Sequence, residues 1–428
     1  MKGIEYLTGL TSISAGSNEL TSVDFSKNTK LKTISLGSNK IKSINLTKNT
    51  ALEGVYLGNN QLTALDISKN TKLQELRASD NKIAKITFGK NTALKSINLD
   101  NNLLTSINLS SLTNLEKFDA SSNKITSVTV NNKYLKQLDL FKNSTLTKVD
   151  VTKCPALEIL ELGGTKVSSI NVKSNKYLRG LGLSGTKVSS VDVTANKNLE
   201  VLYVDQTSIK SLNVTKNPYL GSLKVNNTAI SSLDLSKNKE LYDLDLYKTQ
   251  IKKINIANCS DLVALYKKGV TSSTSSYKYY YQKINSKYCT MYVPANCQIV
   301  ISNPTKTPSK SCISFVERMY TTCLKRKAET AGRDYWANKL CTHEMSGEWV
   351  AACFFMSDEL KSKKLSNDEF VNRLYATFMD REPDSDGKGY WVKFLNDGND
   401  RLAAVMGFSR SPEFIAKCEA SGILPYMD

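Results

Sequence analysis

A period of 21 residues runs through residues 1–266 and constrains the fold of this chain of 428 residues more than any other feature. Leucines recur in register at this spacing, apart from one step of 20 residues and one of 22. These leucines are Leu10, Leu31, Leu52, Leu73, Leu94, Leu115, Leu135, Leu157, Leu178, Leu199, Leu220, Leu241 and Leu262. A unit this short cannot bury its own apolar face, so the units must stack into a solenoid with one continuous core.

Each unit contains two apolar triplets in which inward and outward residues alternate, as in Ile34 and Leu36 followed by Ile41 and Leu46. This alternation predicts two short strands or strand-like arms in each coil. An Asn column lies between the triplets and changes to Thr from Thr165 onward, and a second Asn column precedes each leucine by three residues. Amide side chains in stacked turns satisfy backbone groups, so both columns predict buried hydrogen-bonding ladders.

The pattern L-x-x-L-x-L-x-x-N-x-I-x-x-I-x-L-x-x-N resembles the bacterial leucine-rich repeat, in the 21-residue form of BspA-like surface proteins. The resemblance covers residues 1–266 and implies a β-rich solenoid of short parallel strands, two per coil. It also implies an extracellular or cell-surface location. Because a repeat is already in progress at Met1–Ile4, we expect this chain to be a fragment from which the export signal is absent.

One outward-facing column of the first strand varies from coil to coil, whereas the matching column of the second strand is uniformly small and polar. Uniformity favours a structural role and variety favours recognition. We therefore predict that the face of the first strands binds a protein or glycan ligand, because tyrosine rings and carboxylates gather there. The predicted ligand-binding residues are Tyr56, Arg77, Asp119, Asp139, Glu161, Tyr203, Asp205, Lys224, Asp243, Asp245 and Tyr247.

Lysines recur at one turn of the repeat, so part of the net charge of +18 is organised as a stripe along one edge. These lysines are Lys27, Lys48, Lys69, Lys90, Lys153, Lys216 and Lys237. Residues 1–310 carry 42 basic and 22 acidic side chains, whereas residues 311–428 carry 16 and 18. The stripe indicates either a solvated edge or a surface for an anionic cell-wall or host polymer. Nucleic acid is disfavoured because no nucleic-acid module accompanies the lysines.

No constellation of residues predicts an enzyme. His343 is the single histidine, and no spacing of the nine cysteines is typical of a zinc site. We predict no catalytic residues, no metal and no cofactor. Two enzymatic alternatives remain open: acid–base work by Asp139 and Glu161 on adjacent coils, and a ubiquitin-ligase-like secreted effector with Cys341 as the nucleophile.

After the repeats, a tyrosine-rich segment over residues 267–302 predicts strands that cap the open end of the solenoid. Cys289 and Cys297 are close enough in sequence to bridge such a hairpin, or they are free thiols. Residues 303–311 contain two prolines and predict a short linker.

Residues 312–428 contain a duplication, in which the motif F-V-E-R-M-Y recurs 55 residues later as F-V-N-R-L-Y. Two S-x-x-E capping boxes, which begin at Ser314 and Ser366, predict the starts of the paired helices. Further helix starts are predicted at Asp400 and at Ser411 before Pro412. The sequence predicts a small all-α domain in which the aromatic pairs Tyr335-Trp336 and Tyr390-Trp391 belong to the core.

The pattern F-V-x-R-x-Y…R-x-x-x-x-x-G-x-x-Y-W resembles the domain of unknown function 4214 family, which recurs at the ends of exported bacterial proteins. The family supplies no established catalytic residues. We therefore expect a non-enzymatic interaction protein whose helical domain serves in anchoring or assembly. No stretch approaches the ~18 apolar residues of a membrane span, and we expect a monomer.

Overall fold

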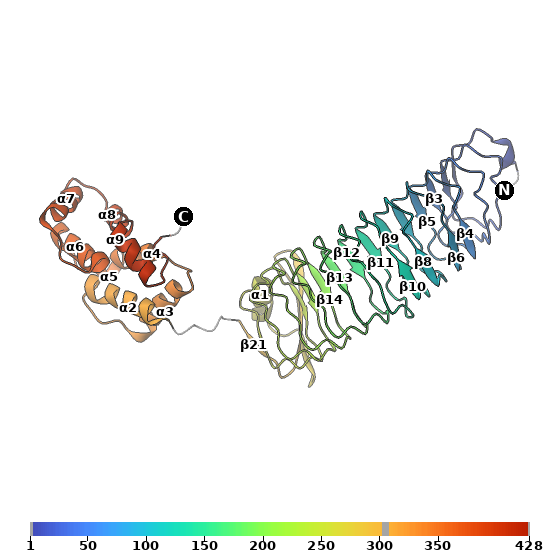
Figure 1. Cartoon of the computed structure of the whole chain (residues 1–428). Helices are drawn as coiled ribbons and strands as arrows, with labels where there is room; N and C mark the ends of the chain where they lie inside the picture. Colours follow the sequence, from blue (N-terminus) through green and yellow to red (C-terminus); the bar gives the residue numbers. More distant parts are fainter. Residues whose placement is uncertain (1–2, 302–307, 427–428) are drawn as a thin grey trace. The chain divides into compact units, whose positions relative to one another are not determined.

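A computed structural model describes residues 3–301 and 308–426 of the protein (Figure 1). The chain divides into two compact units, Met1–Asn303 and Pro304–Asp428. The first unit is a solenoid that begins with the short helix η1 (Ile4–Tyr6). The second unit is helical.

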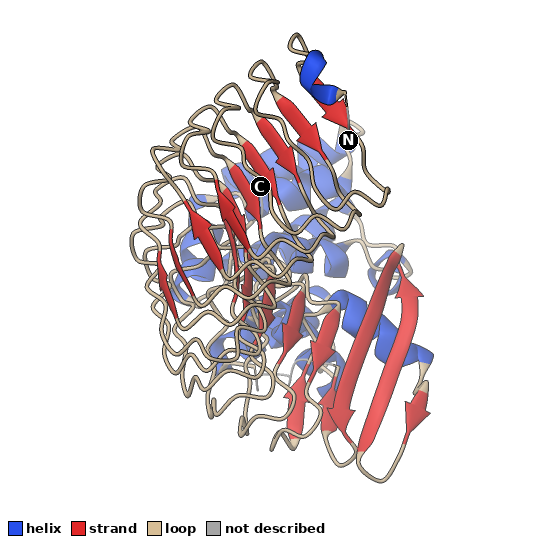
Figure 2. Cartoon of the chain, turned by 90° about the vertical axis from the view of Figure 1, so that its right-hand side faces the viewer, coloured by secondary structure: helices blue, strands red, loops and turns tan. Residues whose placement is uncertain are grey.

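The first strands of successive coils pair in parallel to form one continuous sheet along the solenoid (Figures 1 and 2). Each strand is three residues long with a buried or half-buried central residue, so the repeat register places the leucine core beneath the whole sheet. The parallel strands are β1 (Ser12–Ser14), β2 (Thr33–Ser35), β3 (Gly54–Tyr56), β5 (Glu75–Arg77), β7 (Ser96–Asn98), β9 (Lys117–Asp119), β11 (Gln137–Asp139), β12 (Ile159–Glu161), β13 (Gly180–Gly182), β14 (Val201–Tyr203), β15 (Ser222–Lys224) and β16 (Asp243–Asp245).

The second arm of the coil is a strand in only some of the described coils, where it forms two-stranded parallel sheets. These sheets pair β4 (Ala64–Asp66) with β6 (Lys85–Thr87), β8 (Ser106–Asn108) with β10 (Ser127–Thr129), and β17 (Lys253–Asn255) with β21 (Gln298–Val300). Elsewhere the second arm is held by isolated backbone bonds, such as Lys187 N–H to the Val167 carbonyl (2.9 Å). The uniform polar column of this arm is structural, because its Asp and Asn side chains accept the backbone N–H two residues on, as Asp66 does from Ser68 (2.8 Å).

The Asn column between the arms links coils, whereas the Thr column that replaces it does not. Asn60 Nδ2 donates to the carbonyl of Leu36 in the preceding coil (3.0 Å), and Asn60 Oδ1 accepts from Ile41 N–H of that coil (3.0 Å). Thr207 Oγ1 donates only to the Val204 carbonyl of its own coil (2.6 Å). The change from Asn to Thr therefore removes side-chain links between coils along this edge. The residue just before this column has a positive φ in each coil, as in Asn59 (φ 55°) and Gly185 (φ 67°).

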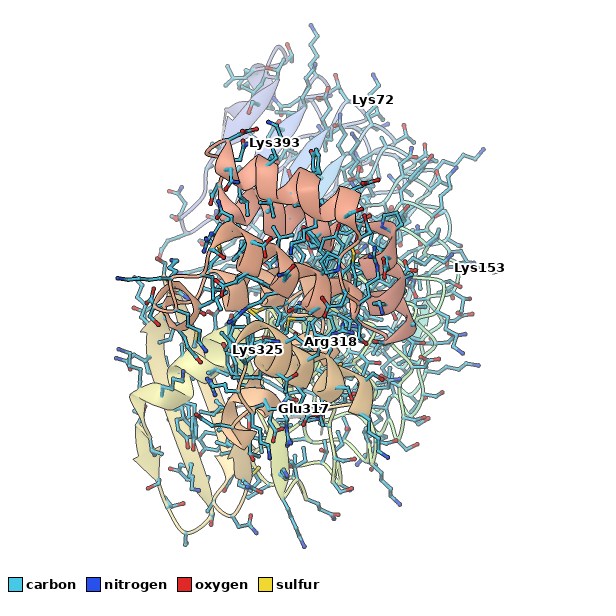
Figure 3. The ribbon with its side chains drawn as sticks, turned by 90° about the vertical axis from the view of Figure 1, so that its left-hand side faces the viewer. Lys72, Lys153, Glu317, Arg318, Lys325 and Lys393 are labelled. Carbon is cyan, nitrogen blue, oxygen red and sulfur yellow. A yellow bond between two sulfur atoms is a disulfide. The ribbon has the colours of Figure 1, made fainter. Side chains whose placement is uncertain are left out.

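The second Asn column lies in the solenoid interior, as predicted. It supports the turns that precede the first strands, and we term the edge formed by these turns the ladder edge. Asn196 Nδ2 donates to the carbonyls of Val172 (3.0 Å) and Asn175 (2.8 Å), and its side chain is fully buried. The other Asn residues of the column make the same two bonds. The lysines of the predicted stripe are exposed at the ladder edge, and Lys72 and Lys153 extend away from the solenoid there (Figure 3).

A helix and an antiparallel hairpin end the solenoid. Helix α1 (Ser260–Lys268) replaces the last expected arm, because Leu262 and Leu265 continue the apolar register on a helical face. The hairpin of β19 (Tyr277–Ile284) and β20 (Lys287–Pro294) adds β20 to the main sheet beside β16, and β18 (Ser272–Ser273) flanks β19. Cys289 and Cys297 are buried as free thiols and do not form the bridge considered above.

The second unit contains only helices in its described residues. Their bounds are α2 (Lys310–Arg318), η2 (Met319–Cys323), α3 (Thr330–Cys341), α4 (Gly347–Phe355), α5 (Asp358–Lys361), α6 (Asn367–Leu374), η3 (Tyr375–Met379), α7 (Ser385–Asn396), α8 (Arg401–Ser409) and α9 (Pro412–Ala420). The starts predicted at Ser366, Asp400 and Ser411 are confirmed. The start predicted at Ser314 is wrong, because Ser309 caps α2 and Ser314 lies inside the helix.

Most of the linker predicted over 303–311 lies outside the described residues, and Lys310 and Ser311 already belong to α2. Among residues 3–301 and 308–426, no helix is long and apolar enough to cross a membrane.

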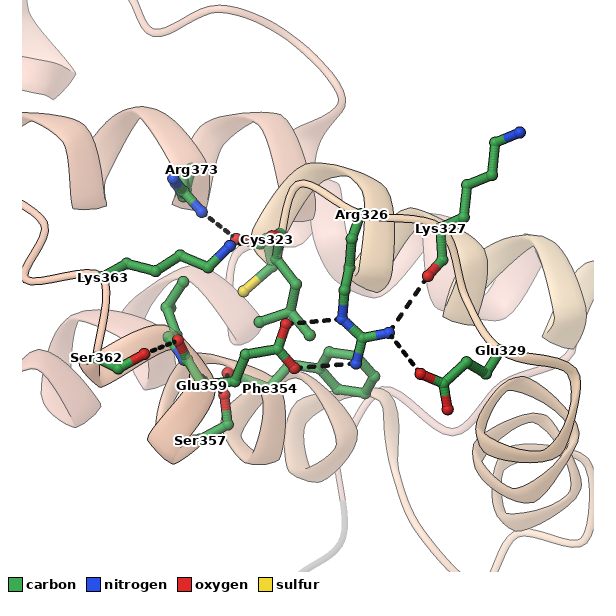
Figure 4. Close-up of polar contacts among 12 residues, drawn as sticks. Cys323, Arg326, Lys327, Glu329, Phe354, Ser357, Glu359, Ser362, Lys363 and Arg373 are labelled. Atoms are coloured by element: carbon green, nitrogen blue, oxygen red, sulfur yellow. Dashed lines mark hydrogen bonds and ion pairs between the residues drawn. The ribbon is translucent and has the colours of Figure 1, made fainter.

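The duplicated motif builds the same packing unit twice. In the first copy the Arg326 guanidinium lies over the Tyr320 ring (4.8 Å) and pairs with both oxygens of Glu359 (2.7 and 2.9 Å; Figure 4). The Tyr320 hydroxyl lies where a side chain at Gly332 would have to be, which explains the motif glycine.

The second copy repeats these contacts. Arg381 lies over Tyr375 (5.1 Å) and pairs with Glu413 (3.5 Å), and the Tyr375 hydroxyl excludes a side chain at Gly387. The π-helical segments η2 and η3 of the two copies pack against each other, and the Thr322 and Thr377 hydroxyls lie 2.8 Å apart. These two threonines occupy equivalent positions, so the two copies meet at matching residues of the motif.

The aromatic pairs are split between core and surface, so the prediction that both members of each pair are buried is half wrong. Trp336 packs on Phe354 (5.5 Å) and Trp391 on Phe408 (5.1 Å). Tyr335 and Tyr390 are exposed. Successive residues on a helix point about 100° apart, and on α3 and α7 the Trp of each pair faces the core whereas the Tyr faces solvent.

Candidate ligand-binding face

The first and third residues of each three-residue strand of the main sheet point outward, and the parallel register aligns them into two columns of side chains. The column predicted to bind ligand runs from Tyr56 on β3 through Asp139 and Glu161 to Asp245 on β16, and then to Tyr292 on β20. Gly182, which has no side chain, interrupts it between Glu161 and Tyr203. We term this surface the sheet face. The predicted residues fall into three groups along it, rather than into one site.

The first group joins Tyr56 and Arg77 through Glu75, the first residue of β5. The Glu75 carboxylate accepts from the Tyr56 hydroxyl (2.7 Å) and from Arg77 Nε (2.7 Å), and the Arg77 guanidinium lies 5.8 Å from the Tyr56 ring centre. Hydrogen bonding to Tyr56 lowers the pKa of Glu75. The polar groups of these three side chains are therefore hydrogen-bonded to one another.

The second group is a run of carboxylates on adjacent coils, formed by Asp100, Asp119, Asp139 and Glu161. Burial raises the pKa of Asp139 to about 6, and the Asp119 and Asp100 carboxylates add to the rise. Burial and the Asp139 carboxylate raise the pKa of Glu161 to about 7. No carboxylate of this group forms an ion pair among residues 3–301. Acidic side chains are thus crowded together on a chain that is basic as a whole.

We expect Glu161→Gln to stabilise the solenoid at pH 7.5 and not at pH 4.5. The folded-state pKa lies above the ordinary value of 4.5, so Glu161 contributes stability below pH 4.5 that is lost as the pH rises through about 7. The amide avoids this loss. The expected gain is about 1 kcal/mol, after allowance for partial solvent screening, and urea denaturation at the two pH values measures it. Glu19→Gln, at an exposed ion pair with Lys40, is the control; an equal gain there would refute the argument.

The third group contains the predicted cluster Tyr203, Asp205, Asp243, Asp245 and Tyr247 on β14 to β16 and just after them. Asp205 accepts from Ser184 Oγ (2.5 Å), and Asp243 accepts from Ser222 Oγ (2.6 Å) and from Thr290. Burial raises the pKa of Asp245 to about 6, and Asp243 adds to the rise. The predicted Lys224 lies 4.5 Å from the Tyr203 ring centre.

The hairpin extends this group with tyrosines that were predicted only to cap the solenoid. Tyr292 lies beside Asp245 in the sheet register, and its ring centre is 5.0 Å from that of Tyr247 and 4.6 Å from that of Tyr277. Tyr279 lies 5.2 Å from Tyr292. Burial and a hydrogen bond with Tyr277 raise the pKa of Tyr292 to about 12. The spacing of two residues between Tyr277, Tyr279 and Tyr281 was the signal that these rings share one strand face.

The two enzymatic alternatives meet physical objections. Cys341 Sγ is bonded to Cys312, so it is not a free thiol nucleophile. Asp139 and Glu161 both have raised pKa values, and they lie on the face of a sheet rather than in a cleft that separates an acid from a base.

Comparisons with known proteins bear on both units. A family model described as a domain of unknown function (DUF4214) matches residues 306–364 and 351–418. No curated protein matches the chain significantly. Among solved structures, the functional domain of InlJ from Listeria monocytogenes is similar with a TM-score of 0.57 and 29% identity, over 60% of this chain and 58% of that one. A leucine-rich-repeat protein of Leptospira interrogans has a TM-score of 0.50 and 22% identity, over 59% of this chain and 76% of that one.

The chain thus spans little more than half of the InlJ domain, and the Leptospira likeness shows the fold alone. The InlJ domain is described as including a cysteine ladder. In this chain the interior ladder is built mainly from Asn, with Cys154 and Cys259 at two of its positions, both buried. Cys259 Sγ contacts the Asn238 carbonyl (3.3 Å), where an Asn amide would donate.

Proposed function

Because this chain is a leucine-rich-repeat protein with a C-terminal DUF4214 domain, we propose that it is a non-enzymatic interaction scaffold whose sheet face binds an extended protein segment. The observation that carries this is the single sheet from β1 to β20, which offers a row of half-buried and exposed side chains of varied chemistry, broken at the buried Gly182. A ligand lying along this row would meet the carboxylate group and the tyrosines in turn.

The charges of the sheet face favour a ligand that carries Lys or Arg. Asp139, Glu161 and Asp245 have raised pKa values because burial and like charges disfavour their ionised forms. A ligand cation placed among them would relieve this repulsion, and the tyrosines beside Asp245 offer ring faces to the same ligand. Tyr residues are also enriched where protein interfaces bind strongly.

An extracellular or cell-surface location belongs to the same proposal. The Cys312–Cys341 disulfide supports it, since disulfides form and persist mainly in oxidising compartments. The helical domain would then serve in anchoring or assembly. The family that it matches is described only as a domain of unknown function.

The proposal is tested by selecting a random peptide display library on the intact chain and measuring the Kd of each enriched peptide. We expect enriched peptides to carry basic and aromatic residues, and to lose about tenfold or more in affinity on the variant Asp245→Asn/Tyr247→Ser/Tyr292→Ser, because anchor residues of this kind dominate interfaces. The control Asn108→Ser/Asp150→Asn changes the uniform column of the second arm. Peptides that bind both variants equally well, or a library without enrichment, would contradict the proposal.

A further inference from the structure

Three tyrosines protrude from the ladder edge at alternate coils. Tyr134, Tyr177 and Tyr219 are 47%, 63% and 58% exposed, although large apolar side chains on this solenoid are otherwise mostly buried. Each lies three residues before the first residue of a strand, namely β11, β13 and β15. The parallel register therefore places the three rings at one height on the edge.

The coils between the tyrosines carry smaller residues at the same position. Ala156 precedes β12 and Asn198 precedes β14 by the same three residues. Because adjacent strands lie ~4.8 Å apart, successive tyrosines are separated by about 10 Å. The result is a row of aromatic rings with gaps between them, at an interval close to the length of one disaccharide unit in an extended polysaccharide.

Lysines without a carboxylate partner line the same stretch of the edge, and Lys133 Nζ lies 4.7 Å from the centre of the Tyr134 ring. Three nearby acidic residues are engaged: Glu116 with Lys136 (2.8 Å), Asp192 with Lys173 (3.1 Å) and Glu200 with Arg179 (2.9 Å). Glu158, a further acidic residue of this stretch, is not among the ion pairs of residues 3–301. Within residues 3–301, the remaining exposed lysines of this stretch form no ion pair with a carboxylate. They are Lys133, Lys153, Lys176, Lys197 and Lys216.

The spacing of these side chains is rigid, because each turn sits on the buried Asn column. Asn132 Nδ2 donates to the carbonyls of Leu109 (2.9 Å) and Leu112 (2.8 Å), and Asn175 and Asn217 hold the later turns in the same way. A ligand that matches the spacing binds without the entropic cost of ordering the surface.

We propose that this part of the ladder edge is a binding track for a linear anionic polysaccharide. Sugar rings pack on Tyr134, Tyr177 and Tyr219, while carboxylate or sulfate groups of the polymer meet the lysines between them. The track is separate from the sheet face and does not depend on the function proposed for it. The interval of about 10 Å between rings disfavours a nucleic acid, whose stacked bases would require aromatic rings at closer spacing.

The test measures binding of polygalacturonate and heparin to the intact chain by calorimetry at several salt concentrations, with poly-dT and polyphosphate as comparison polymers. We expect at least one polysaccharide to bind, and its affinity to fall as salt rises. The variant Tyr134→Ser/Tyr177→Ser/Tyr219→Ser is expected to lose about tenfold or more in affinity with an unchanged salt dependence. Changing Lys153, Lys176 and Lys197 to Ser should reduce the salt dependence itself.

Two control variants keep the outcome interpretable. Tyr281→Ser/Tyr288→Ser removes exposed tyrosines from the hairpin, and Lys27→Ser/Lys48→Ser/Lys69→Ser removes lysines from the part of the edge that lacks tyrosines; both should bind like the unaltered chain within about twofold. Urea denaturation checks that every variant is folded. The proposal is overturned if neither polysaccharide binds, if the triple tyrosine variant binds as well as the unaltered chain, or if poly-dT or polyphosphate binds more tightly with the same dependence on the tyrosines.

Discussion

Replacing Asn196 with Ala is expected to lower the free energy of unfolding of the solenoid by about 3 kcal/mol, a large effect for one side chain. The amide of Asn196 donates to two buried carbonyls, those of Val172 (3.0 Å) and Asn175 (2.8 Å). Each carbonyl also accepts a backbone N–H, from Asn175 (3.0 Å) and Leu178 (3.1 Å). Ala therefore removes one of two donors from each buried carbonyl and opens a small cavity where the fully buried Asn196 side chain had been. Urea denaturation followed by circular dichroism measures the change.

The protein itself supplies the matched comparison for this prediction. Cys259 occupies the equivalent position in another coil, where its thiol contacts the Asn238 carbonyl at 3.3 Å. Asn196→Cys should therefore cost about 1 kcal/mol less than Asn196→Ala, because a thiol fills the space and keeps one weak donor. Equal losses, or a loss below ~1 kcal/mol for Ala, would show that the two bonds donated by the Asn196 amide do not stabilise the turn.

Replacing Met291 with Asp is expected to have a still larger effect, about 4 kcal/mol or more, because it buries an unpaired carboxylate. Met291 is fully buried and lies between Leu244 of the last parallel strand and Tyr280 of the hairpin. The hairpin would detach from β16 and expose the core of the last coil. Limited proteolysis should then cleave within β19 and β20 well before the earlier coils unfold.

A substitution on the opposite face of the same strand is the control. Tyr288 is 62% exposed, so Tyr288→Asp should leave the protease resistance of the hairpin and its thermal stability nearly unchanged. If the two Asp variants behaved alike, the hairpin would not be the cap of the solenoid core.

The repeat could be derived from the sequence because every coil must bury the same apolar face and therefore carries the same residues at the same positions. A leucine at each step of 21 residues and a buried Asn three residues before it leave only a stacked solenoid. Helix α1 was not predicted, because Leu262 continues the 21-residue register and Ser260–Lys268 was therefore assigned to the repeat.

The candidate sites were harder to derive, because they depend on which coils lie side by side. The predicted residues Tyr203 and Asp245 lie on the sheet face. The neighbouring Tyr277 and Tyr292 come from a segment without repeats, so its register against β16 could not be predicted from a period. Tyr134, Tyr177 and Tyr219 follow the repeat, but they occur only in alternate coils, so a pattern sought in every coil does not include them.

The contact between Thr322 and Thr377 has a consequence for how the helical domain is built. The hydroxyls of these equivalent residues are 2.8 Å apart, with the π-helical segments packed around them. The buried residues of the two copies, among them Tyr320 and Tyr375, belong to one apolar cluster. The duplicated motif therefore forms one shared core rather than two separate ones, and the copies differ at exposed positions such as Lys327, where the second copy has Glu382.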